Sequence, residues 1–323
     1  MESKPIQPLT NQIKYHFASK AEGQKLLSEN TEYYNKMNQS DIEWRLRKKD
    51  ATIKELIAFA QDNALEFTND EKEDIKMAIK FIEESLIYYG FKLPFPDDGI
   101  VFIKTTMLEE GGAAAYTHKT QIYLGEQIFP SNKTANLPPF LINTMKTRLL
   151  HKFFSTVAHE IFHCLTRHSP EFRKRMYRLI GFTILDHDLI FSQEIKNKIL
   201  NNPDVEHMDN YAEFTIDGVK RKCEIIVIMT KTWWELNDKQ KETEVFFRYI
   251  ETVLVPIDAL DTYYSYKKAS DFDEIVGKNT PYNISPEEIL ADNFKEVIMR
   301  KNFNDFESPE LLYNMVAALK EFK

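Results

Sequence analysis

Residues 156–165 read Thr156-Val157-Ala158-His159-Glu160-Ile161-Phe162-His163-Cys164-Leu165. They belong to a run from about residue 140 to residue 167 without internal proline or glycine, which predicts one long helix. Because a helix advances about 100° per residue, we expect His159 and His163 to project from one face, about 40° apart. The other side of the helix carries the apolar residues that a core needs, namely Phe154, Val157, Ile161, Cys164 and Leu165.

This pair of histidines predicts a metal site. Two imidazoles one helical turn apart can bind a single ion, and Glu160 lies on the flank that would face a metal-bound water. Zinc would lower the pKa of that water to about 7 and polarise a scissile carbonyl. Glu160 would then act as the general base. The alternative is a pair of helix histidines that only form hydrogen bonds near the surface.

A catalytic zinc site needs a third protein ligand and one position left for water. The segment from Ser285 to Phe294 predicts a helix with proline in its first turn. Glu288 and Asp292 stand one turn apart on it. We expect Glu288 to be the third ligand and Asp292 to accept the free ring N–H of a ligand histidine. Glu287 is the nearest rival of Glu288 as ligand.

The two segments together, His159-Glu160-x-x-His163 and Glu288-x-x-x-Asp292, resemble the gluzincins, the thermolysin-like branch of the zincin peptidases. The resemblance implies an α+β, zincin-like catalytic domain. That domain would have a small mixed sheet with an edge strand, an active-site helix and a third-ligand helix. It also implies a zinc metallopeptidase that cleaves a peptide or protein substrate. His159, His163 and Glu288 would bind Zn²⁺, and Asp292 would be the hydrogen-bond partner of a ligand histidine.

One departure from this family concerns spacing. The second histidine and Glu288 are separated by 125 residues (288 − 163), more than gluzincins usually show. We therefore expect an inserted subdomain, which contains a hairpin, around residues 169–280. A metzincin fits less well, because it would need glycine and histidine where the chain has Thr166 and Ser169.

The same resemblance suggests two further parts of the site. The segment from Ala113 through Ala114 and Ala115 to Tyr116 sits where such enzymes keep the edge strand that binds substrate backbone. An ordinary alanine-rich edge strand is the alternative. Tyr282 is our candidate for the donor that stabilises the oxyanion, and a packing or surface role is its alternative. Its competitors are His207, Tyr211, Tyr263, Tyr264 and Tyr266.

The rest of the chain predicts a mostly helical N-terminal region, residues 1–95, followed by the catalytic domain, residues 96–323. Residues 1–40 are polar, and we interpret them as partly irregular. Asn69 or Asp70 is expected to cap the helix predicted over residues 71–89. A turn at Asp217-Gly218 predicts a hairpin. Hydrophobic periodicity predicts helices at 50–62, 71–89, 236–266 (interrupted at Pro256), 286–300 and 308–321, and strands at 100–105, 113–117, 120–124, 211–216 and 223–229.

Composition limits the other classes of function. The formal net charge of −8 argues against a nucleic-acid partner, and the basic run from Arg173 to Arg178 is interpreted as a solvated helix face. No apolar run reaches the length of a membrane span or a signal peptide, so a cytoplasmic location is the simplest expectation, with signal-less export as the alternative. Two competing functions stay open: a zinc-binding protein without hydrolytic activity, and a metal-dependent hydrolase of a non-peptide amide. The sequence gives no indication of oligomeric state.

Overall fold

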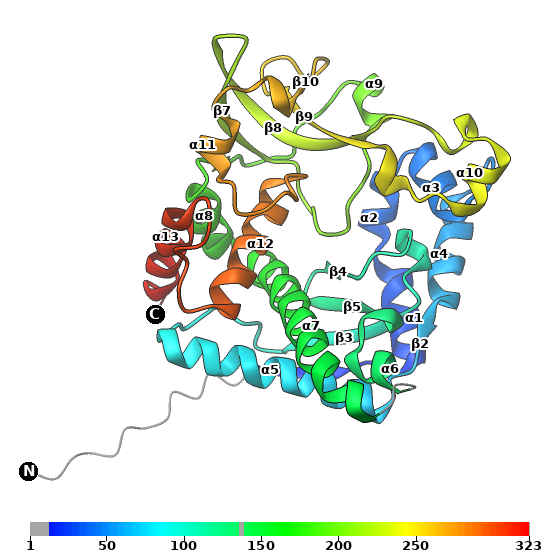
Figure 1. Ribbon diagram of the computed structural model, residues 1–323. Helices are drawn as coiled ribbons and strands as arrows, with labels where there is room; N and C mark the ends of the chain where they lie inside the picture. Colours follow the sequence, from blue (N-terminus) through cyan, green and yellow to red (C-terminus); the bar gives the residue numbers. More distant parts are fainter. Residues whose placement is uncertain (1–12, 136–138, 323) are drawn as a thin grey trace, which may run out of the picture.

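The first of two sheets lies in the N-terminal half of the chain. The computed structural model describes residues 13–135 and 139–322. Strands β1 (Tyr15–Phe17), β3 (Ile100–Thr105), β5 (Gln121–Gly125) and β4 (Ala115–His118) follow one another in that order, and β2 (Ala64–Leu65) pairs with β3 (Figure 1). β1, β3 and β5 are parallel, whereas β4 is antiparallel to β5. The sheet is therefore mixed, and β4 is its edge strand, as expected.

Alternation along the strands gives this sheet two apolar faces. Phe102, Ile122 and Leu124 are buried in the cluster that also contains the apolar sides of α5 (Asn69–Tyr89) and α7 (Pro139–His168). Ile103 and Tyr123 are buried on the opposite face. That face is covered by the short N-terminal helices, α1 (Lys20–Glu29), α2 (Thr31–Lys36), α3 (Gln39–Leu46) and α4 (Ile53–Asp62).

Helix α5 begins at Asn69, two residues before the predicted start at residue 71. Its cap is Thr68, and not Asn69 or Asp70 as expected. The Thr68 hydroxyl accepts the backbone N–H of Glu71 at 3.3 Å, and the Glu71 carboxylate accepts the N–H of Thr68 at 2.8 Å. This reciprocal pair is a capping box, which satisfies two backbone donors at once. The helix ends at Gly90, whose φ of 74° suits glycine.

The N-terminal region is more regular than expected. Residues 1–12, part of the segment interpreted as partly irregular, lie outside the described residues, but β1, α1 and α2 account for most of residues 15–36. The region is mostly helical, and it also supplies β1 and β2 to the first sheet. The boundary expected at residue 95 therefore does not coincide with a break in packing.

The second sheet lies entirely within residues 169–280, the range expected to be inserted. Its order is β10 (Tyr264–Ser265), β9 (Ile250–Pro256), β8 (Val219–Met229), β7 (Asn210–Ile216) and β6 (Thr183–Ile184), and all pairs are antiparallel. The hairpin between β7 and β8 turns at Asp217 and Gly218, whose φ angles are 51° and 78°, as predicted. Figure 1 shows this sheet above α7 and α12 (Pro286–Met299).

The helix predicted over residues 236–266 is wrong. Only α10 (Asp238–Thr243) is α-helical there, a single 3₁₀ turn follows at Phe246–Tyr249, and Ile250–Pro256 forms strand β9. Ile250, Thr252 and Val253 are β-branched, and they pair with β8 along its whole apolar half. Pro256 closes the strand, where a missing N–H is tolerated, and does not kink a helix.

The remaining helices follow the predictions closely. The helices expected at 286–300 and 308–321 are α12 and α13 (Pro309–Lys320). Helix α7 ends before Ser169, which caps α8 (Pro170–Arg178) through its hydroxyl. Arg173 on α8 corrects one expectation, because its guanidinium pairs with Asp209 at 2.8 Å and is not solvated. Short helices complete the list: α6 (Pro130–Thr134), α9 (Gln193–Lys196) and α11 (Phe272–Val276).

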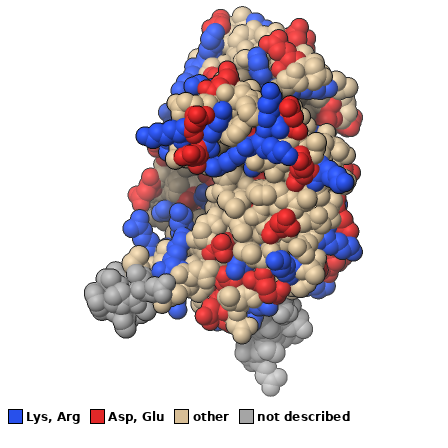
Figure 2. All heavy atoms as spheres, turned by 90° about the vertical axis from the view of Figure 1, so that its right-hand side faces the viewer, with Lys and Arg blue, Asp and Glu red and all other residues tan. Residues whose placement is uncertain are grey.

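The described surface shows no large field of one charge on the face formed by α3, α4 and α10. Figure 2 shows Lys and Arg side chains across the upper half of that face, with Asp and Glu side chains among them and below. None of the described helices combines the length and the apolar character needed to cross a lipid bilayer.

A buried ionic network joins the N-terminal helices to the loop after α9. The Arg45 guanidinium contacts Asp41 at 3.0 Å and Glu110 at 2.8 Å, and it donates to the carbonyl of Asn201 at 2.8 Å. Only 1% of the Arg45 side chain is exposed. Because all three partners are buried with it, the network fixes where the loop starts.

We expect Arg45→Ala to lower the free energy of unfolding by about 3–5 kcal/mol, because it leaves two buried carboxylates without their cation. Urea unfolding followed by circular dichroism measures the change. Arg248→Ala is the matched control: its side chain is 70% exposed, and its pair with Glu244 contributes little. An equal loss in both variants would contradict the assignment of the stability to the buried network.

Candidate metal centre

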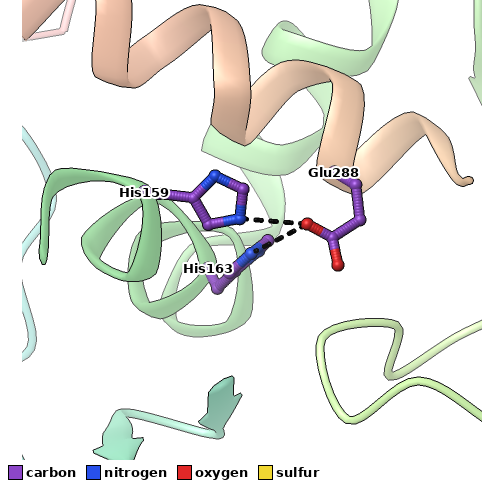
Figure 3. Close-up of side chains that lie close together, drawn as sticks. All are labelled: His159, His163 and Glu288. Atoms are coloured by element: carbon purple, nitrogen blue, oxygen red, sulfur yellow. Dashed lines mark hydrogen bonds and ion pairs between the residues drawn. The ribbon is translucent and has the colours of Figure 1, made fainter. Parts of the chain in front are cut away.

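Helices α7 and α12 pack against each other and bring three predicted residues together (Figure 3). His159 Nε2 lies 3.0 Å from Glu288 Oε2, and His163 Nε2 lies 3.7 Å from the same oxygen. Tetrahedral zinc with bonds of about 2.0–2.1 Å would separate its ligand atoms by about 3.3 Å. The observed distances lie on either side of that value, so the three side chains could hold one ion with small adjustments.

Local sequence places Glu288 at the start of α12. The Ser285 hydroxyl accepts the backbone N–H of Glu288 at 3.1 Å, and Pro286 occupies the first turn, so the helix begins at a defined residue. The Glu288 side chain is 1% exposed. Its second oxygen, Oε1, accepts a hydrogen bond from the Asn202 amide at 2.6 Å. The carboxylate is thereby held with Oε2 toward the two histidines.

The other nitrogen of each ring faces a different carboxylate. His159 Nδ1 lies 2.9 Å from Asp292, as expected for a partner that fixes the tautomer. His163 Nδ1 lies 3.0 Å from Glu287. A neutral histidine that donates Nδ1–H to its carboxylate keeps the Nε2 lone pair available for a metal ion on the side of Glu288.

These two carboxylates are themselves held in place. Asp292 accepts the hydroxyl of Thr280 and pairs with Lys295. Glu287 accepts hydroxyl donors from Thr166 and Tyr177, the latter at 2.8 Å. Glu287, expected only as a rival ligand, therefore lies on the far side of His163 from Glu288.

The arrangement fits a bound cation by a second observation. His163 Nε2 is fully buried and has no hydrogen-bond partner within the described residues. A buried polar atom without a partner carries a large desolvation cost. A metal ion between His163, His159 and Glu288 would remove that cost by coordination.

The charges of the site also favour a cation. Burial by itself lowers the pKa of His159, but hydrogen bonds to Asp292 and Glu288 outweigh it and raise that pKa to about 9. Burial likewise opposes the charge of Asp292, yet its contacts with His159 and Lys295 lower its pKa to about 2. The pKa of Glu288 is also held below its usual range by the two histidines, despite its burial. The carboxylates of this site therefore stabilise positive charge, including the charge of a proton on the imidazole of His159.

Glu160 lies beside this group and lines the same cleft, which has a volume of about 640 Å³. Its side chain is buried, and Oε2 accepts the Thr117 hydroxyl at 2.8 Å. Thr117 belongs to the edge strand β4, so this hydrogen bond connects β4 to helix α7 through Glu160. The cleft runs between α7, α12 and the chain that leads into β4.

The predicted edge segment is only partly placed at the cleft. Ala113, Ala114 and Ala115 line it, but the strand proper begins at Ala115 because Gly111 and Gly112 form a left-handed turn just before. The Tyr116 side chain is not at the cleft. It stacks on Tyr123 at a ring distance of 4.6 Å, on the opposite face of the sheet.

Tyr282 lines the same cleft as Ala113, Ala114 and Ala115. Its ring is 37% exposed, and burial of the hydroxyl together with the charges of Glu288 and Asp204 raises its pKa well above the usual value. The phenol therefore stays protonated and can donate a hydrogen bond. Its competitors lie elsewhere: His207 pairs with Asp188, and the tyrosines at 211, 263, 264 and 266 do not line the cleft.

Sequence reasoning missed Asp204. Its carboxylate lies 3.9 Å from His163 Nε2 and forms a compact group with Glu160 and His163, all within 4.8 Å. Burial, and then the charge of Glu160, raise its pKa well above the usual value. Asp204 follows Asn202-Pro203 in a loop without periodicity, so no pattern in the sequence marks it.

One other described cluster has the composition of a metal site, namely Asp188, His207 and Asp209. Asp188 and His207 are exposed, and the buried Asp209 is already paired with Arg173. It therefore offers a poorer site than the one between α7 and α12. Comparison with known proteins adds no further assignment, because no family model, no curated protein and no solved structure matches the chain.

Proposed function

We propose that this chain is a zinc metallopeptidase of the zincin type, with His159, His163 and Glu288 as ligands. The observation that carries the proposal is the convergence of two Nε2 atoms on one carboxylate oxygen, with each Nδ1 fixed by a separate carboxylate. Three protein ligands leave one tetrahedral position for water, which is the pattern of a catalytic site.

Zinc, when bound, supplies a Lewis acid that lowers the pKa of a water and polarises a carbonyl. Glu160 accepts the water proton and returns it to the leaving amine as general acid. Thr117 directs Glu160 by donating its hydroxyl to Oε2. Tyr282 donates its hydroxyl to the oxyanion that develops on the attacked carbonyl. The free edge of β4 orders the substrate backbone.

The position of Glu160 favours this function over a zinc-binding protein without activity. A structural site needs a fourth protein ligand and no base, whereas Glu160 is a buried carboxylate that lines the same cleft as His159 and Glu288. The edge strand beside the cleft favours a peptide over another amide, because its backbone groups match those of an extended chain.

Metal removal tests the proposal. We expect purified protein to contain about one zinc per chain and to hydrolyse members of a mixed peptide pool, detected by mass spectrometry. Dialysis against a strong chelator should abolish hydrolysis, and added Zn²⁺ should restore it, because the water is activated only beside the ion. Mg²⁺ serves as the control addition, since two imidazoles suit zinc and not magnesium. Hydrolysis that survives complete zinc removal would contradict the proposal.

A further inference from the structure

A loop from the second-sheet region reaches into the cleft. It begins at Asn201, whose amide donates to Asp41 at 2.6 Å and whose carbonyl accepts from Arg45. At its other end Asp209 is held by Arg173. The loop is therefore fixed at both ends by ionic contacts and is part of the permanent wall of the site.

Two side chains of this loop meet the metal centre and the edge strand. The Asn202 amide donates to Glu288, and its carbonyl oxygen accepts the backbone N–H of Asp204 at 2.9 Å. Asp204 Oδ1 accepts the backbone N–H of Thr117 at 2.7 Å. The side chain of Asp204 is 9% exposed, and within residues 13–135 and 139–322 its second oxygen accepts no hydrogen bond.

The contact with Thr117 closes one end of the edge strand. Gly125 of β5 donates to the carbonyl of Ala114, so alternate residues of β4 face β5. Ala115 and Thr117 therefore direct their backbone groups to the free edge. Asp204 takes the N–H of Thr117, so a substrate backbone can pair at Ala115 but cannot continue past Thr117.

The direction in which a substrate pairs with β4 and the charge of its terminus together identify which end of the substrate lies beside Thr117. A chain that adds antiparallel to β4 has its N-terminal end beside Thr117. At that position the second oxygen of Asp204, which accepts no hydrogen bond from the described residues, can accept one from an ammonium group. The parallel orientation would instead bring a C-terminal carboxylate against the Glu160 carboxylate beside Thr117, where like charges repel.

The distance from the metal centre limits how much substrate fits. Asp204 Oδ1 is 3.9 Å from His163 Nε2. In any peptide the α-amino nitrogen lies about 2.5 Å from the carbonyl carbon of the same residue, given bonds of about 1.5 Å and an angle of about 111°. A carboxylate this close to the ligands can therefore reach the ammonium group of the residue whose carbonyl is attacked.

We propose that the site is an aminopeptidase site, in which Asp204 binds the protonated free N-terminus and the loop admits a single residue before the cleaved bond. This inference rests on the proposed function and names its substrate class. Asn202 is a positioning residue, because it joins the backbone of Asp204 to the ligand Glu288.

Paired peptides test the inference. Wild-type protein should release single residues from a free N-terminus, and it should cleave the N-acetylated twin at least 10-fold more slowly. Asp204→Asn should lower kcat/KM for the free peptide by roughly 10- to 150-fold, since a hydrogen bond to a charged group is lost, and zinc content should not change. Glu206→Gln, which removes a charge from the same loop outside the cleft, is the matched control and should behave as wild type.

A binding measurement gives a readout without turnover. With zinc-loaded Glu160→Gln, calorimetry should show at least 10-fold tighter binding of the free peptide than of its acetylated twin, and adding Asp204→Asn should remove the difference. Equal cleavage of both peptides at internal bonds would overturn the inference and leave the peptidase standing. Zinc-loaded wild-type protein that hydrolyses neither would overturn the proposed function, and the inference with it.

Discussion

Glu160→Gln is expected to lower kcat for peptide hydrolysis by about 10²- to 10⁴-fold, because a positioned general base contributes rate enhancement of that size. Glutamine keeps the shape of the side chain and can still contact the Thr117 hydroxyl, but it cannot accept the proton of the attacking water. Glu160 is not one of the three side chains, His159, His163 and Glu288, that we propose as zinc ligands. Zinc content should therefore stay at the wild-type level.

The measurement combines elemental analysis with steady-state hydrolysis of one peptide. Glu171→Gln serves as the control, because Glu171 is 66% exposed on α8 and far from the cleft lining. A Glu160→Gln protein that keeps its zinc and its full activity would remove Glu160 from the mechanism. Loss of zinc in this variant would instead show that Glu160 belongs to the coordination sphere.

The buried polar residues of helix α12 lower the stability of the fold where they form this site. Its first nine residues, 286–294, are all buried, and four of them are the polar residues Glu287, Glu288, Asp292 and Asn293. Burying carboxylates is costly unless each is paired. Each of these three buried carboxylates has a histidine neighbour, and a core of similar volume could be made from apolar side chains at lower cost. Retaining charge here makes physical sense for a site that binds a cation.

Local features of this site could be predicted from the sequence. His159 and His163 share a face because a helix imposes that spacing, and Asp292 follows Glu288 by one turn for the same reason. Helix geometry alone does not decide which of the two adjacent glutamates is the ligand. Glu287 and Glu288 project about 100° apart, and which one meets Nε2 depends on how α12 is rotated against α7, a property of tertiary packing.

Features that depend on distant segments could not be predicted. Asp204 reaches the cleft only because Asp41, Arg45 and Glu110, far away in sequence, hold the start of its loop. Strand β9 has a similar cause, since its conformation is determined by pairing with β8 and not by its own periodicity. The α+β class and the mixed first sheet, in contrast, follow from strand patterns that each lie within a few residues.

Glu288→Ala is expected to abolish stoichiometric zinc binding. Loss of a residue that only orients a ligand typically weakens metal binding by about 10- to 100-fold, so loss of a ligand should exceed that range. The variant also frees the Asn202 amide and leaves both Nε2 atoms without their shared carboxylate. Hydrolysis should fall with the zinc content, because the attacking water loses its activation.

Competition with a chromogenic chelator measures the zinc affinity of the variant, and elemental analysis measures its occupancy as purified. Glu287→Gln is the matched control, since the Glu287 carboxylate contacts His163 Nδ1, whereas the Glu288 carboxylate faces Nε2. That variant should still bind one zinc, with an affinity reduced by about 10- to 100-fold. The reverse result, full zinc in Glu288→Ala and none in Glu287→Gln, would transfer the third ligand to Glu287. Such a transfer would require α12 to rotate by about 100° against α7, which the burial of residues 286–294 opposes.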